Sequence, residues 1–189
     1  MHYLSEASRT ALIVIDMQEK LMPVIADGDE VLRRALTLAQ VAKLLTIPIL
    51  GTSQQPLRLG RTVPAVEAMV EQSIEKDDFD ACAEPAFLAA LAPERDEIVV
   101  LGCEAHVCVL QTVLGLRHRQ RRVKLVADAI GSRQNFNKAA AIERARSAGA
   151  EIVTCEMLIF EWLRSSAHPQ FRDILPLIKN LGIAHSPSR

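Results

Sequence analysis

Continuous apolar runs alternate with segments of helical periodicity along most of the chain. In the run at 10–15 every residue after the first is apolar. Such runs are typical of strands buried on both faces of a parallel sheet, whereas half-exposed strands alternate apolar and polar residues. The same reasoning predicts six strands, of which the third is weakly patterned. They lie at 10–16, 47–51, 73–76, 97–102, 123–128 and 151–154.

Helical patterns fill most of the segments between these strands. Asp27 and Asp29 are candidate N-caps for a helix in which apolar residues recur every three or four positions through Leu45. Further helices are predicted at 84–91, 106–119, 135–147, 157–164 and 169–179, with a loop at 52–62 and a short helical or irregular element at 63–72.

The alternation of strands and helices predicts an α/β fold. We expect a three-layer doubly wound parallel sheet of about six strands with helices on both faces. Right-handed crossovers favour the strand order 3-2-1-4-5-6. A length of 189 residues predicts a single domain over 1–189, with a loosely held tail from about residue 180.

Charge and hydropathy narrow the classes of partner. A net charge of -1 provides no electrostatic footprint for nucleic acid or for an anionic membrane surface. No apolar run approaches the roughly 20 residues of a membrane span, and residues 1–9 lack the pattern of a signal peptide. We therefore expect a cytoplasmic protein that binds a small-molecule substrate and forms a homo-oligomer, with neither nucleic acid nor membrane as a partner.

Cysteine is a candidate nucleophile in this chain. Four cysteines are too few for a disulfide scaffold, and none has the spacing of a zinc site. Cys108 follows an apolar strand and a short polar turn, which puts it on the first turn of a predicted helix. The partial positive charge and unpaired N–H groups of a helix start favour thiolate over thiol. We expect structural roles for Cys82, Cys103 and Cys155.

Three reactive side chains fall on one edge of the predicted sheet. Asp16 ends the first strand, Lys76 ends the third and Cys108 follows the fourth. Ligands of doubly wound sheets bind outside the carboxyl ends of the strands, where the strand order reverses. Asp16 is then a candidate base for the thiol, and Lys76 a candidate electrostatic partner. Backbone N–H groups between Glu104 and Cys108 are candidates for an oxyanion hole.

Each of these residues also has a structural interpretation. A buried cysteine commonly serves as a small hydrophobe, an acid after a strand commonly forms a turn, and Lys76 lies in a run of charged residues. Their placement on one edge favours catalysis. The alternative hypothesis is a non-catalytic oligomeric interaction module on the same fold. A dinucleotide-dependent enzyme is disfavoured, because no G-x-G-x-x-G follows the first strand.

Three blocks of the sequence resemble the isochorismatase-like cysteine hydrolase superfamily. They are Ile15-Asp16-Met17-Gln18, Glu75-Lys76 followed by Phe79, and 102–112 (GCEAHVCVLQT). Their order and rough spacing are those of the family, and the resemblance extends over nearly the whole chain. Two further segments, 62–64 and 167–171, resemble the isochorismatase-domain proteins whose substrates are mostly unassigned.

The resemblance implies a function and a set of residues. It implies a catalytic triad of Asp16, Lys76 and Cys108. It also implies a cis peptide bond between Cys103 and Glu104, which together with Ala105 would turn backbone N–H groups toward an oxyanion. The expected activity is hydrolysis of a small amide or a related carbonyl or imidate compound through a covalent intermediate on the cysteine.

The chain departs from the nicotinamidases of this superfamily. Those enzymes carry an Asp-x-His pair and a further histidine after the second strand, which hold a metal. The corresponding segment 51–56 (GTSQQP) has no histidine and no acid. We therefore expect neither a metal nor another cofactor.

Four further residues are weaker candidates for the substrate pocket. Gln18 and Gln54 could line it, although turn-forming or solvated roles are about as probable for each. Phe79 could form a wall, although an aromatic residue there is more often part of the core. His106 could touch substrate or could form a local hydrogen bond at the helix start.

Overall fold

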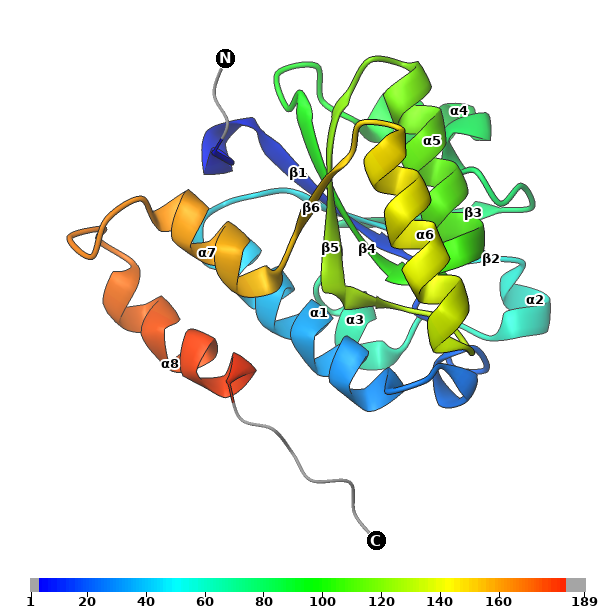
Figure 1. Cartoon of the computed structure of the whole chain (residues 1–189), viewed down its shortest axis with the longest axis horizontal. Helices are drawn as coiled ribbons and strands as arrows, with labels where there is room; N and C mark the ends of the chain where they lie inside the picture. The colour runs from blue at the N-terminus through cyan, green and yellow to red at the C-terminus, as the bar shows by residue number, and fades with distance from the viewer. Residues whose placement is uncertain (1–3, 183–189) are drawn as a thin grey trace, which may run out of the picture.

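A computed structural model describes residues 4–182 of the chain. Six parallel strands form one sheet in the order β3-β2-β1-β4-β5-β6 (Figure 1). This confirms the predicted fold class and strand order. The strands are β1 (Thr10–Ile15), β2 (Ile49–Gln54), β3 (Gln72–Lys76), β4 (Glu97–Cys103), β5 (Arg122–Gly131) and β6 (Glu151–Val153).

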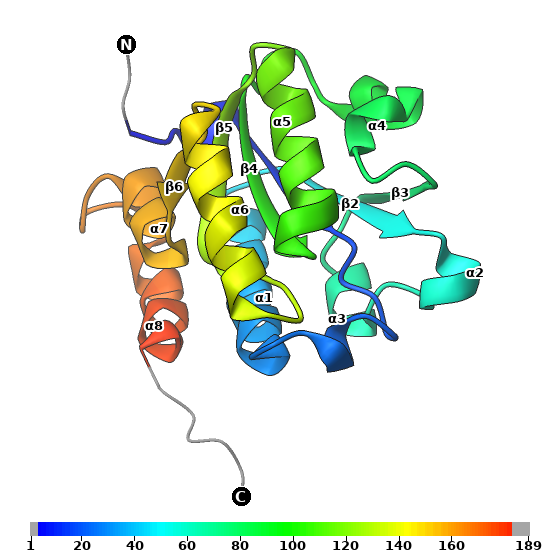
Figure 2. The same ribbon diagram turned by 45° about the vertical axis from the view of Figure 1, so that its right-hand side comes forward.

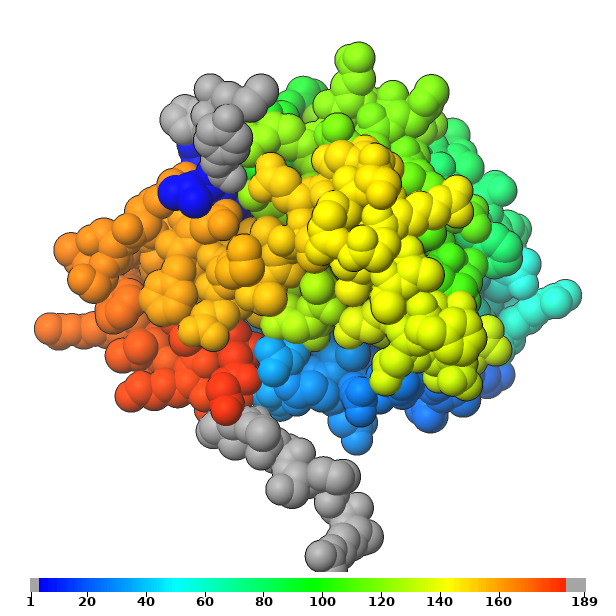
Figure 3. Space-filling view, viewed as in Figure 1, coloured from blue at the N-terminus to red at the C-terminus, as the bar shows by residue number. Residues whose placement is uncertain are grey.

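Helices cover both faces of the sheet (Figures 1 and 2). One apolar cluster joins the sheet to α1, α7 and α8, and a second joins it to α4, α5 and α6. In Figure 3 the side chains of α6, α7 and α8 (yellow, orange and red) form much of the surface that faces the viewer. The helices are α1 (Gly28–Leu44), α2 (Pro56–Leu59), α3 (Pro64–Glu67), α4 (Pro85–Ala90), α5 (Leu110–His118), α6 (Asn135–Ser147), α7 (Cys155–Leu163) and α8 (Phe171–Leu181), and short turns are η1 (Ala7–Arg9), η2 (Met22–Val24), η3 (Ala81–Ala83) and η4 (Ala105–Val109).

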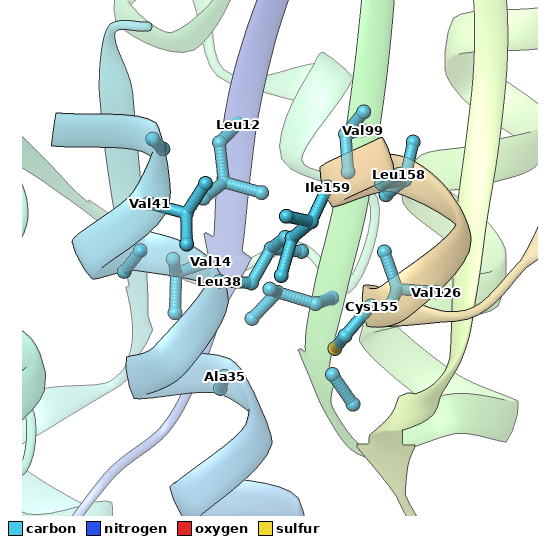
Figure 4. Close-up of a cluster of buried hydrophobic side chains, with 14 of the residues drawn as sticks. Leu12, Val14, Ala35, Leu38, Val41, Val99, Val126, Cys155, Leu158 and Ile159 are labelled. Atoms are coloured by element: carbon cyan, nitrogen blue, oxygen red, sulfur yellow. The ribbon is translucent and has the colours of Figure 1, made fainter. Parts of the chain in front are cut away.

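Strand β1 shows why an uninterrupted apolar run was needed. All of its residues are buried, and successive side chains point to opposite faces of a sheet. Leu12 and Val14 pack in the cluster with α1 and α7 (Figure 4), whereas Ile13 and Ile15 pack in the cluster with α5 and α6. The apolar run thus supplies both halves of the core.

Some predicted boundaries were wrong. The segment at 52–54, expected in a loop, belongs to β2, because all three residues pair with β3 and Thr52 pairs with β1 as well. Such pairing stabilises a strand even where its side chains are polar. Strand β5 extends to Gly131, so that Asp128 lies within it. Helix α8 reaches Leu181, and the remainder of the expected loose tail, 183–189, lies outside the described residues.

A glycine at the end of β4 brings two strand ends unusually close. Gly102 pairs with Ile15 and has a φ of 117°, in the region that favours glycine. A Cβ atom at this position would lie 2.1 Å from the Ile15 carbonyl oxygen. The close approach places Asp16, which follows Ile15, beside the turn that follows β4.

We expect Gly102→Ala to lower the free energy of unfolding by about 3 kcal/mol or more. An alanine is strained at this positive φ, and its methyl group would overlap the backbone of Ile15. Urea denaturation measures the change. Gly182→Ala is the matched control, since its Cβ would find only the Lys179 carbonyl at 3.7 Å, and it should shift stability by less than about 0.5 kcal/mol. Equal effects of both substitutions would contradict the close-approach explanation.

Candidate active site

A buried ion pair joins the ends of two strands that are not neighbours. The Lys76 ammonium at the end of β3 donates to Asp16 Oδ2 over 2.7 Å, and both side chains are completely shielded from solvent. Strand β2 lies between them in the sheet. Its Thr52 hydroxyl donates to Asp16 Oδ1 over 2.7 Å, so that both carboxylate oxygens are hydrogen bonded.

The Lys76 ammonium is saturated by protein acceptors. Besides Asp16, it donates to Gln54 Oε1 over 2.6 Å and to the Asp78 carbonyl over 3.3 Å. An ammonium group has three hydrogens, and each has an acceptor here. Lys76 is therefore arranged to act through its charge.

Cys108 joins this cluster from beyond β4, on the other side of the position between β1 and β4 where the strand order reverses. It lies in the π-helical turn η4, which precedes α5, where an ordinary helix start was expected. Single π turns are frequent at functional sites. The Cys108 side chain is buried, and its Sγ lies 3.8 Å from Gln54 Oε1.

The surroundings of the Cys108 sulfur favour the thiol over the thiolate. Burial, followed by the charge of Asp16, raises the pKa of Cys108 to about 12, although the charge of Lys76 acts in the opposite direction. Desolvation of the sulfur therefore opposes the effect on the thiol pKa that is expected of a helix start. A base must take the proton when the sulfur reacts.

The turn between β4 and η4 leaves backbone donors free. The peptide bond between Cys103 and Glu104 is cis. The Glu104 carbonyl accepts from the N–H groups of Val107 and Val109. The N–H groups of Ala105 and His106, by contrast, have no acceptor in the part of the chain that the structure describes.

Two side chains of the same turn bind the segment after β5. Arg133 donates to the Glu104 carboxylate from its backbone N (3.0 Å) and from Nε (3.1 Å). His106 Nδ1 lies 3.0 Å from the hydroxyl of Ser132, which is fully buried. The sequence does not indicate these pairings, since the partners are 29 and 26 residues apart, with α5 and β5 between them.

The weaker pocket candidates separate in the structure. The Gln18 amide is used entirely within the protein: it accepts from Gln54 N–H (2.9 Å) and donates to the carbonyls of Gln54 (3.0 Å) and Gly60 (2.7 Å). Gln18 thus holds the end of β2. Phe79 is 49% exposed and lies on the surface, whereas Gln54 is in the centre of the cluster.

A cavity of about 420 Å³ lies beside Lys76, between α2 and the end of β3. Lys76 is the one residue of the buried cluster among its described lining, and the other lining residues are a mixture of charged, polar and apolar side chains. They are Gln55, Pro56, Leu57, Arg58, Glu75, Asp77 and Glu84. Neither Asp16 nor Cys108 is among these residues, and the Lys76 side chain is shielded from solvent, so the cavity lies next to the end of β3 and does not open onto the ion pair.

Comparison with known proteins identifies the family. The model of the isochorismatase domain matches residues 10–157. The chain belongs to the isochorismatase family. It is 36% identical over 174 residues to isochorismatase domain-containing protein 2A of Mus musculus, with 89% of this chain and 82% of that protein covered.

Solved structures share the isochorismatase fold of this chain. One, described as MAR1 ribonuclease from Caenorhabditis elegans, has a TM-score of 0.88 and 31% identity, covering 98% of this chain and all of that one (100%). The YcaC gene product from Escherichia coli, described as an octameric hydrolase of unknown specificity, has a TM-score of 0.84 at 20% identity, covering 96% and 98%. At that identity the second likeness shows the fold alone.

The side chains and helices of residues 4–182 bear on the expected lack of a metal and on the expected location. No group of three or more His, Cys, Asp or Glu side chains there is arranged to hold a metal ion. No helix there is long and apolar enough to cross a membrane. The absence of cofactors and the cytoplasmic location stay predictions.

We expect Asp16→Asn to lower the pKa of the Cys108 thiol. The charge of Asp16 raises that pKa, so its removal shifts the titration of the thiol to lower pH. The pH dependence of iodoacetamide labelling, with peptide mapping, measures the pKa at Cys108. Asp173→Asn, an exposed substitution on α8, is the control and should leave the titration unchanged. An unchanged or higher pKa in Asp16→Asn would contradict the assigned proximity of Asp16 to the sulfur.

Proposed function

We propose that the protein is a metal-independent cysteine hydrolase that acts on a small amide or a related carbonyl or imidate compound. Members of the isochorismatase family are generally hydrolases. Cys108 is the proposed nucleophile, Asp16 the base and Lys76 the electrostatic partner. The observation that carries the proposal is the buried ion pair of Asp16 and Lys76 beside Cys108, whose Sγ lies 3.8 Å from the Gln54 amide oxygen that also accepts from Lys76.

In the first half of the proposed reaction, Asp16 takes the thiol proton as Sγ bonds to the substrate carbon. The electrons of the carbonyl double bond move to oxygen, where the free N–H groups of Ala105 and His106 are the proposed donors. The tetrahedral intermediate then expels its amine, which receives the proton from Asp16. A thioester with Cys108 is left.

In the second half, water attacks the thioester carbon and Asp16 accepts a water proton. Collapse of the intermediate breaks the carbon–sulfur bond, releases a carboxylic acid and returns the proton from Asp16 to the sulfur. Lys76 keeps its charge throughout, which stabilises Asp16 as a carboxylate between proton transfers.

We expect turnover of a panel of small neutral amides and imidates to fall by about a thousandfold or more in Cys108→Ser, because a hydroxyl gives up its proton much less readily than a thiol and is a far weaker nucleophile. Intact mass spectrometry of quenched reactions should find an acyl adduct on the wild-type protein. Cys82→Ser is the matched control, since Cys82 is also a buried thiol with its pKa raised to about 12 by burial. Full turnover by Cys108→Ser would contradict a covalent mechanism.

The alternative is a non-catalytic oligomeric interaction module. It predicts that no member of the panel forms an adduct and that Cys108 substitutions leave the oligomer unchanged. Homo-oligomer formation itself is proposed under either function, with an octameric relative of the same fold as its support. A relative described as a ribonuclease makes RNA a further substrate to include, although the net charge of -1 does not favour it.

A further inference from the structure

The amide of Gln54 lies where the three proposed catalytic groups meet, yet the proposed reaction assigns it no role. Its Oε1 is 2.6 Å from Lys76 Nζ and 3.8 Å from Cys108 Sγ. Gln54 is at the end of β2 and pairs with Lys76 of β3. It is buried, so its amide has protein partners in place of water.

The hydrogen bonds of Gln54 fix the orientation of its amide. Nε2 donates to the Asp77 carbonyl over 2.7 Å, which requires the NH₂ end to face Asp77. Oε1 must then face the ammonium of Lys76, which has hydrogens and no lone pair. The backbone of Gln54 is held on both sides by the Gln18 amide. The Gln54 oxygen is therefore a fixed acceptor beside the sulfur.

A fixed neutral acceptor favours the protonated form of the thiol. An S–H group can donate to Oε1, whereas a thiolate would face the negative end of the amide dipole. The same oxygen takes one hydrogen of Lys76, which leaves another for Asp16. One side chain thus affects both the nucleophile and the ion pair.

We propose that Gln54 is a positioning residue that keeps the Cys108 thiol protonated and aimed, and that fixes Lys76 against Asp16. During attack, the proton of the Cys108 thiol would then pass from the sulfur to Asp16. The inference rests on the proposed function in taking Cys108 as the nucleophile. Its measurable consequence is on the titration of the thiol, which can be followed whether or not a substrate is known.

Two substitutions of similar length separate this role from simple packing. Gln54→Met retains an unbranched buried side chain and removes both the acceptor and the NH₂ donor. Gln54→Glu retains an acceptor for Lys76 and adds a negative charge beside the sulfur. If the amide controls the thiol, the two changes act in opposite directions on the thiolate fraction.

The experiment labels the native full-length protein with iodoacetamide at pH 8 and maps the labelled peptides. The readout is the labelling rate of Cys108 divided by that of Cys82 in the same sample. Cys82 is buried in the same apolar cluster as Cys108 and lies against the Thr112 carbonyl, away from the hydrogen bonds of Gln54, so general opening of the protein raises both rates. We expect the ratio to rise by about threefold or more in Gln54→Met and to fall by about threefold or more in Gln54→Glu.

Gln72→Met, an exposed substitution at the start of the same strand as Lys76, is the matched control and should stay within about twofold of wild type. Changes of the same sign in both Gln54 variants, or changes smaller than twofold in both, would overturn the inference. Retained turnover by Cys108→Ser would instead overturn the proposed role of Cys108 as nucleophile, so the two failures are distinguishable.

Discussion

The buried pair of Asp16 and Lys76 is the interaction on which the candidate site depends. Removing two charges from water costs several kcal/mol per ion, which their attraction offsets only where the remaining polar atoms are also hydrogen bonded. Thr52 and Gln54 of the intervening strand supply those bonds. The pair therefore ties the carboxyl ends of β1, β2 and β3 into one arrangement, because a shift of any of these strands would leave a buried charge without a partner.

The same dry environment acts on Cys108, the proposed nucleophile. Burial raises the pKa of its thiol to about 12, despite a position near the start of a helix. In the proposed reaction, Asp16 takes the thiol proton, and Lys76 balances the charge of Asp16. The proposal therefore couples proton transfer to attack and requires no standing thiolate.

Much of the fold was predictable because its signals are local. Apolar runs indicated the strands, and the handedness of crossovers led to the observed strand order. The edge position of Asp16, Lys76 and Cys108 followed from that order. The extension of β2 through Gln54 was missed, since its polar side chains resemble a loop until both neighbouring strands are present. The pairings of Glu104 with Arg133 and of His106 with Ser132 had no local signal either.

By itself, the sequence determined the architecture and the three residue types at one sheet edge, because hydrophobic periodicity and chain connectivity depend on residues close together along the chain. Only the tertiary structure decided the state of those residues. The pKa of the Cys108 thiol depends on desolvation of the sulfur. The proposed role of Gln54 depends on the orientations of its own amide and of the Gln18 amide. The hydrogen bonds of Lys76 depend on acceptors that come from separate segments of the chain. Each of these is a property of atoms brought together in space, where distance and the exclusion of water set the strength of every charge.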